Sequence, residues 1–160
     1  MDKEFKIKGL MMDPLTNSPI VVLQDIQNGT LLPIWVGIFE ANAIALQIER
    51  VDTPRPMTHD LLKNVLMQLN AEVEKIVVSD LRENTFYAII HLKLNGEGIA
   101  IDSRPSDAIA LALRTDSPIF VTETVITNSR NLALTKEKLD PEEVRKWLEN
   151  LNPDELGYKM

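Results

Sequence analysis

The sequence contains no cysteine and only two histidines, His59 and His91, among its 160 residues. The absence of cysteine excludes disulfide bonds, zinc sites built on thiolates and cysteine nucleophiles. Two histidines also leave little material for a metal site of the histidine type. A metal ion bound by this chain would therefore have to be held by carboxylates.

Basic residues and long apolar runs are scarce as well. The chain has 17 Lys and Arg against 24 Asp and Glu, a net charge of −7 and a pI near 4.9. A broad basic surface for tight nonspecific nucleic-acid binding is thus excluded, and any phosphate contact must be local. No apolar stretch approaches the roughly 20 residues that span a bilayer, and charges interrupt the first apolar stretch at the N-terminus. We expect a cytoplasmic protein with no membrane segment.

The composition, with 44% hydrophobic and 26% charged residues, is that of one globular domain with a well-buried core. Short alternating runs predict strands over 5–12, 20–25 and 31–36, with a hairpin turn at Asn28-Gly29. Three more runs between 72 and 102 indicate an antiparallel meander, and a short strand is expected over 119–122. Strands that alternate with helices and are joined by hairpins predict a single α+β domain with a mostly antiparallel sheet.

Four helices are predicted beside this sheet. Two of them, over 38–50 and 105–114, are rich in alanine and apolar on most sides, so we expect them to be buried. An amphipathic helix, capped by Thr58, places one apolar stripe on its surface: Leu61, Leu62, Val65, Leu66 and Leu69. A C-terminal helix opens at Asp140-Pro141. We therefore divide the chain into a domain over 1–130 and, over 131–160, a C-terminal helix and short tail that pack on or extend this domain.

The two alanine-rich segments resemble each other. A shift of 65 positions aligns 34–36 with 99–101 and the identical residues 43–46 with 108–111. Internal duplication is one account of this similarity, and the shared composition of two buried helices is the other. If the halves are related, Glu40 and Asp107 both lie in the first turn of an equivalent helix.

Two short polar clusters, RPMTHD over 55–60 and DSRPSD over 102–107, each stand at the start of a predicted helix. Free backbone N–H groups and the helix dipole favour an anion at such a position. The hydroxyls and carboxylates could simply cap the helices, but capping does not explain Arg55 and Arg104. A guanidinium beside a helix N-terminus is unfavourable unless an acid or a phosphate offsets it. These arginines are therefore expected either to pair with Asp60, Asp102 or Asp107 or to bind a ligand.

No standard catalytic motif is present: the chain lacks a Walker loop, a dinucleotide fingerprint, a nucleophile elbow and a His-Glu-x-x-His sequence. His59, next to Asp60, is a candidate general acid or base, with a surface or capping role as the alternative. Glu40 is either a first-turn acid stabilised by the helix dipole or a buried carboxylate held for function.

Three strings follow one another between residues 32 and 121: LPIWVGIFEANAIALQIE, RPMTHDLL and IDSRPSDAIALALRTDSPIFV. In this order and spacing they resemble the bifunctional nuclease domain family, which is found in bacteria and plants. The resemblance implies a single α+β domain, nuclease activity on both DNA and RNA with little base preference, and self-association. Nucleic acid is therefore the expected substrate and a homo-oligomer the expected state. The resemblance assigns no catalytic roles.

The residues are compatible with the nuclease that this resemblance implies, and our hypothesis is a metal-dependent enzyme in which both clusters share one pocket. Such an enzyme needs oxygen ligands for Mg²⁺ or Mn²⁺, positive groups on the phosphate and a means to activate water. The candidate ligands are Asp102, Asp107 and Glu40. The candidate catalytic residues are Arg55 and Arg104, which would clamp the phosphate, His59, which would orient or deprotonate water, and Asp60, which would fix the tautomer of His59.

The alternative hypothesis is a noncatalytic oligomeric domain that binds a partner protein or a small anion such as a nucleotide. Large apolar residues such as Trp35, Phe39 and Met11 would then serve packing or a subunit interface. Divalent-metal binding near Asp102 and Asp107 would favour the enzyme, and anion binding without turnover would favour the binding domain.

Overall fold

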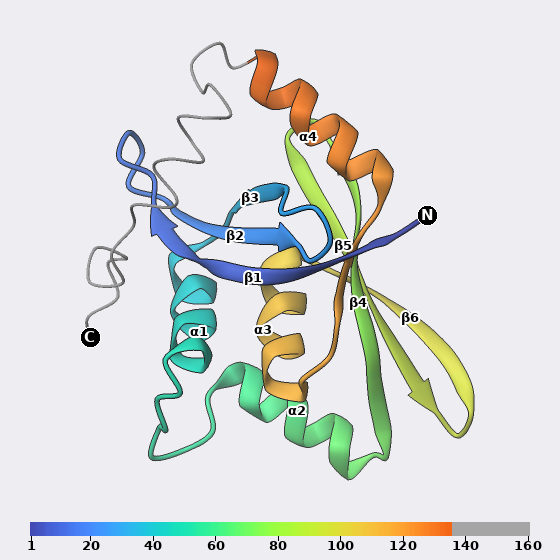
Figure 1. Ribbon diagram of the computed structural model, residues 1–160. Coiled ribbons are helices and arrows are strands. Elements are labelled where there is room, and N and C mark those ends of the chain that lie inside the picture. The colour runs from blue at the N-terminus through green and yellow to red at the C-terminus, as the bar shows by residue number, and fades with distance from the viewer. Residues whose placement is uncertain (136–160) are drawn as a thin grey trace.

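The computed structural model describes residues 1–135, with side chains described through residue 130 (Figure 1). Its strands are β1 (Lys3–Met12), β2 (Pro19–Asp25), β3 (Leu31–Trp35), β4 (Ala71–Arg82), β5 (Thr85–Leu94), β6 (Glu97–Ser103) and β7 (Ile119–Val121). Its helices are α1 (Ile38–Ile48), α2 (Thr58–Gln68), α3 (Pro105–Thr115) and α4 (Glu123–Thr135).

The seven strands form one sheet in the order β3-β2-β1-β7-β4-β5-β6. Two antiparallel meanders, β1 to β3 and β4 to β6, make up most of it, and the short β7 joins them. β7 runs antiparallel to β1 and parallel to β4. The predicted α+β class, single domain and mostly antiparallel sheet are confirmed.

The predicted hairpins are present, and their turns explain the pairing register. Asn28-Gly29 lies in the connection of β2 and β3, where Gly29 has a φ of 76° and its N–H donates to the Asp25 carbonyl. Asn95 and Gly96 link β5 to β6 with φ values of 52° and 80°. Positive φ at both central residues is the requirement of a tight two-residue hairpin turn. Leu94 and Glu97 are therefore held directly opposite each other.

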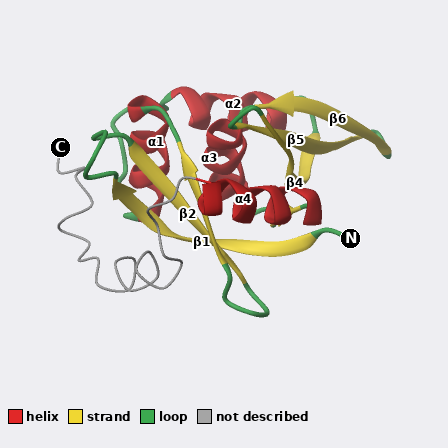
Figure 2. Ribbon diagram, turned by 90° about the horizontal axis from the view of Figure 1, so that it is seen from above, coloured by secondary structure: helices red, strands yellow, loops and turns green. Residues whose placement is uncertain are grey.

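α1, α3 and α2 lie side by side, as Figure 2 shows from above. α3 begins with Pro105 as predicted. It is the central helix of the core, because it buries Ala108 to Ala112 without interruption. α1 packs against α3 and buries Ala41 and Ile44 to Leu46. α3 is thus buried as expected, whereas α1 is buried along one side and leaves Ile38 and Phe39 exposed. The first turns of the two helices lie at a common end of the layer.

α2 is the expected amphipathic helix, but most of its apolar stripe is exposed to solvent. Leu61, Val65 and Leu69 are 57%, 45% and 64% exposed, and His59 is the one buried residue of the helix. The helix contacts the core through His59 and the partly buried Leu66, so the remaining stripe stays in water. Its N-cap is Met57 and not Thr58, which is the first helical residue.

α4 was not predicted, because its run of Thr, Asn and Ser shows no clear apolar period. It packs on β4 and buries Val125. The predicted helix from Asp140 lies outside the described residues, and the division at residue 130 stays a prediction. Among the described helices, none combines the length and apolar character needed to cross a membrane.

Candidate active site

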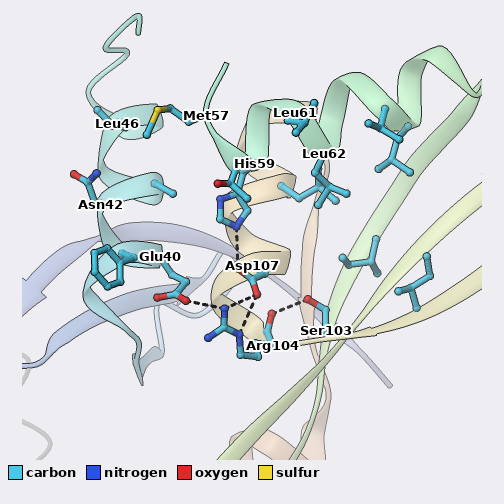
Figure 3. A pocket seen from close by; sticks show the side chains of 18 of the residues that line it. Glu40, Asn42, Leu46, Met57, His59, Leu61, Leu62, Ser103, Arg104 and Asp107 are labelled. Carbon is cyan, nitrogen blue, oxygen red and sulfur yellow. Dashed lines mark hydrogen bonds and ion pairs between the residues drawn. The ribbon is translucent and has the colours of Figure 1, made fainter. Parts of the chain in front are cut away.

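A pocket of about 1100 Å³ opens between the first turns of α1, α2 and α3 and the strands β5 and β6 (Figure 3). Its walls are largely apolar and include Phe39, Met57, Leu61, Leu62, Val65 and Ile101. Four polar side chains, Glu40, His59, Arg104 and Asp107, lie together at one end. The two polar clusters of the sequence therefore meet in one pocket.

These four side chains form a continuous chain of hydrogen bonds and ion pairs. Arg104 Nη2 lies 2.7 Å from Glu40 Oε1 and 2.8 Å from Asp107 Oδ2, and Arg104 Nε donates to Asp107 Oδ2 at 3.0 Å. The other oxygen of Asp107, Oδ1, lies 2.8 Å from His59 Nε2. One guanidinium thus joins two carboxylates, and one of these carboxylates also holds the imidazole.

The starts of three helices supply this cluster. Glu40, His59 and Asp107 stand in the first turns of α1, α2 and α3, and Arg104 is the N-cap residue of α3. The helix dipoles stabilise the two acids, and the acids offset the guanidinium that would otherwise be unfavourable at a helix start. Asp107 and Glu40 together raise the pKa of Arg104. The expected pairing of Arg104 with a nearby acid is confirmed.

Gly37, the N-cap residue of α1, makes room for the Glu40 carboxylate. A Cβ atom at position 37 would collide with Glu40 Oε2. The Glu40 side chain is only 16% exposed, so the carboxylate folds back over the helix start rather than into open solvent. The absence of a side chain at residue 37 therefore contributes to the placement of Glu40 beside Arg104.

His59 is buried, with a side chain 11% exposed, and its described partner is Asp107. An ionised Asp107 accepts a hydrogen bond, so the proton of a neutral imidazole is assigned to Nε2 and the lone pair to Nδ1. Within the described residues, every fully buried polar side-chain atom has a hydrogen-bond partner. His59 forms its one hydrogen bond there through Nε2, and Nδ1 forms none. The lone pair of Nδ1 is therefore not engaged in a hydrogen bond within this part of the chain.

Asp60 does not contact the imidazole as we had predicted. Its Oδ1 lies 2.7 Å from Arg114 Nε, and its Oδ2 accepts the Met57 N–H at 3.0 Å. Partial burial alone would raise the pKa of Asp60, but the bonds from Met57 and Arg114 hold this pKa below its ordinary value. Adjacent residues on a helix point in different directions, so the Asp60 side chain points away from His59. The carboxylate beside the imidazole is that of Asp107.

Arg114 was missed in the sequence analysis. Its side chain is only 3% exposed, and besides Asp60 it donates to the carbonyls of Ala110 and Ala43. It thereby joins α3 to α1 and to the first turn of α2, which carries His59. The available signal was a charged residue directly after the apolar run from Ala108 to Leu113, where burial requires complete pairing.

Asp102 borders the pocket but does not contact the cluster, and Arg55 is not among the residues that line the pocket. Asp102 alternates along β6 with Ile101 and Ser103, so its side chain leaves the sheet on the opposite face. Arg55 is exposed, and its side chain has no ion pair within the described part of the chain. In residues 1–130, no three side chains of His, Asp or Glu are grouped so as to hold a metal ion. The set Glu40, Asp102 and Asp107 thus does not fit a metal as these residues lie.

Comparison with known proteins finds a domain family whose match covers the polar cluster. The family model of the bifunctional nuclease domain matches residues 21–132, which include all four residues of the polar cluster. The chain belongs to the bifunctional nuclease domain family. The resemblance noted in the sequence is therefore confirmed.

Relatives of two kinds are found. An uncharacterised protein of Mycobacterium tuberculosis is 34% identical over 96% of this chain and 97% of its own length. Bifunctional nuclease 1 of Oryza sativa subsp. japonica is 25% identical over 74% of this chain, and bifunctional nuclease 2 of Arabidopsis thaliana 29% over 66%. The matched part is 37% and 33% of these plant proteins.

Proposed function

We propose that this chain is a nuclease that hydrolyses phosphodiester bonds of DNA and RNA, with little base preference, in the pocket between α1, α2 and α3. Membership of the family and the names of the plant relatives support the class of activity. The observation that carries the proposal is the His59–Asp107 pair beside Arg104 at one end of an open pocket.

His59 is the proposed general base. Asp107 holds the ring with its proton on Nε2, and Nδ1 takes a proton from the attacking water. The imidazolium that results is stabilised by the Asp107 carboxylate 2.8 Å away. This arrangement needs no contact between His59 and Asp60.

Arg104 is the proposed phosphate ligand. Nε and Nη2 are bound to Asp107 and Glu40, whereas Nη1 has no described partner in residues 1–130 and the side chain is 64% exposed. The two carboxylates orient the guanidinium so that its free edge is available to a phosphate oxygen. They also leave the cluster with an excess negative charge while His59 is neutral, so we expect modest substrate affinity.

The metal dependence expected from the sequence stays a prediction. Glu40 and Asp107 are both bound to Arg104, and the Asp102 side chain lies on the other face of the sheet. The steps above therefore use no metal ion, and a chelator experiment tests whether Mg²⁺ or Mn²⁺ is needed.

The test is cleavage of fluorescent single-stranded DNA and RNA by highly purified protein. Asp107→Asn is compared with Asp80→Asn, because Asp80 also pairs with an arginine, Arg82, but lies outside the pocket. We expect cleavage by wild type and by Asp80→Asn, and a loss of about 100-fold in Asp107→Asn. Equal activity in all three proteins would assign the cleavage to a contaminant or another site. Binding of nucleotide without turnover would favour the noncatalytic domain.

We also propose that the chain self-associates. Phe39 is 84% exposed, and the stripe of α2 adds further exposed apolar surface at the same pocket. An exposed apolar patch of this kind is typical of an interaction surface. The cytoplasmic location expected from the sequence stays a prediction.

A further inference from the structure

β6 forms one edge of the sheet, and this edge is open. Six of its seven residues are exposed, and no described strand pairs with its outer side (Figure 1). Exposed edges are normally protected by a proline, a bulge or a central charge. β3 at the opposite edge carries Pro33, but the centre of β6, Gly98 to Ile101, has neither proline nor charge. β6 is therefore ready to pair with another strand.

The β5–β6 hairpin determines which backbone groups point outward. The two-residue turn at Asn95 and Gly96 closes on the pair Leu94 and Glu97, which exchanges backbone hydrogen bonds. Bonded and non-bonded pairs alternate along an antiparallel ladder. The N–H and C=O groups of Gly98, Ala100 and Asp102 therefore point away from β5. A new strand must bind to these three residues.

We propose that β6 pairs antiparallel with β6 of a second copy of this chain, with the two-fold axis at Ala100. This inference rests on the self-association in the proposed function and assigns its pairing to the edge of β6, whose Ile101 lines the same pocket as Phe39 and the stripe of α2. The two Ala100 residues then form a hydrogen-bonded pair, because the backbone N–H and C=O groups of each point outward. Glu97 lies opposite Ser103 of the second copy, and Asp102 lies opposite Gly98, so no acids face each other.

The other symmetric registers pair fewer residues, since an axis at Ile99 or Ile101 pairs only five of the seven residues of β6. An axis at Asp102 would place two identical carboxylates directly opposite each other, which is destabilising. An axis at Gly98 would pair only the residues from Glu97 to Ile99. The register at Ala100 uses the whole length of β6 in both copies.

Apolar side chains also match across the proposed axis. Ile99 and Ile101 are 37% and 42% exposed and lie on the face of the sheet that carries the pocket. In the paired sheet each Ile99 lies opposite Ile101 of the other copy, so four isoleucines become neighbours. Ile101 lines the pocket, and the second copy would therefore extend the pocket wall.

On the opposite face, the pairing supplies a partner for two charges. Lys93 lies opposite Gly98, and Asp102 of the second copy would lie on the other side of the same glycine. Gly98 has no side chain, and the space that a Cβ atom would occupy at this position is open. Neither Lys93 nor Asp102 has an ion pair within residues 1–130. We infer that Lys93 of each copy pairs with Asp102 of the other across Gly98.

The test measures the solution mass of the full chain by light scattering after size exclusion. Wild type is expected at twice the chain mass of 18.1 kDa. Lys93→Glu places two acids together and is expected to shift the protein to one chain mass. The double variant Lys93→Glu with Asp102→Lys exchanges the charges and is expected to restore the doubled mass. Lys6→Glu, on the exposed surface of β1, is the control for the change in net charge.

Ala100→Pro provides a second, uncharged test. The N–H of Ala100 points outward, so proline removes a bond between copies and none within the chain. We expect a folded protein by circular dichroism with one chain mass.

A wild type of one chain mass would overturn the proposed self-association. A doubled mass that persists in both Lys93→Glu and Ala100→Pro would overturn the β6 surface alone. Failure of the charge exchange to restore the mass would overturn the Lys93–Asp102 contact. None of these results depends on cleavage, so nuclease activity is judged separately.

Discussion

His59 Nε2 and Asp107 Oδ1 lie 2.8 Å apart, although the two residues are 48 positions apart in the sequence. The contact joins the first turn of α2 to the first turn of α3. It holds the one buried histidine of the described residues beside an exposed guanidinium. The proposed base, its orienting acid and the proposed phosphate ligand thereby lie in one pocket.

The first prediction concerns His59. We expect His59→Gln to lower kcat about 100-fold, because glutamine has no lone pair of suitable basicity for the attacking water. His91→Gln is the matched control, since His91 lies on the face of β5 away from the pocket. Similar rates for both variants would exclude His59 as the base.

The second prediction concerns Gly37. A methyl group at this position would displace the Glu40 carboxylate, so Gly37→Ala should lower kcat about tenfold, equivalent to about 1.4 kcal/mol in the barrier. Because this effect acts through Glu40, Gly37→Ala should add little to Glu40→Ala, whose side chain is too short to collide. A double-mutant cycle measures this coupling. Additive losses would show that Gly37 acts independently of Glu40.

The third prediction concerns Arg114. Arg114→Met leaves Asp60 and the carbonyls of Ala43 and Ala110 without their described partner. Removal of one member of a fully buried ion pair typically costs about 3 kcal/mol or more of unfolding free energy, and the 33% exposure of the Asp60 side chain lowers the expected cost to about 2 kcal/mol. We expect this loss in urea denaturation at neutral pH. Arg82→Met, which breaks an exposed pair with Asp80, should cost about 1 kcal/mol or less. Equal losses would contradict a structural role for Arg114.

The fourth prediction concerns the pH dependence of the Asp60 contribution. The pKa of Asp60 is lowered in the folded state from an ordinary value of 3.8, so its ionised form stabilises the fold fully above this value. The contribution is lost as the pH falls through the lowered pKa. The difference in unfolding free energy between wild type and Asp60→Asn should therefore be largest near neutral pH and shrink below 3.8. A difference that grows in acid would contradict this sign.

Much of the fold could be predicted from local patterns. The turn residues Asn28-Gly29 indicated one hairpin, the three runs between 72 and 102 indicated a meander, and the helix expected over 105–114 begins at Pro105. These signals depend on residues a few positions apart. The insertion of β7 between β1 and β4 was not predicted, because it depends on how two meanders pack. α4 was missed since its polar residues show no apolar period.

The site was predicted in composition but not in pairing. The two clusters at helix starts were recognised, and so was the need for an acid beside Arg104. Adjacency in sequence suggested Asp60 as the partner of His59, whereas helix geometry directs Asp60 to Arg114. Strand alternation likewise directs the Asp102 side chain to the other face of the sheet, although the residue borders the pocket. Contacts between elements, such as Glu40 with Arg104, carry no signal in a single sequence.

The fifth prediction concerns the metal ion. If Arg104 provides the positive charge on the phosphate, cleavage persists in excess chelator, and Arg104→Ala loses about 100-fold in kcat with or without added Mg²⁺ or Mn²⁺. If a metal ion is required instead, chelator abolishes cleavage. The ion must then compete with Arg104 for Glu40 and Asp107, because both carboxylates contact this guanidinium. Calorimetric titration of Mn²⁺ into wild type and Arg104→Ala distinguishes the two cases without measuring activity. Tighter Mn²⁺ binding in the variant, together with chelator-sensitive cleavage in wild type, would show that Glu40 and Asp107 bind a metal ion. The metal ion, and not Arg104, would then be the group that stabilises the phosphate charge.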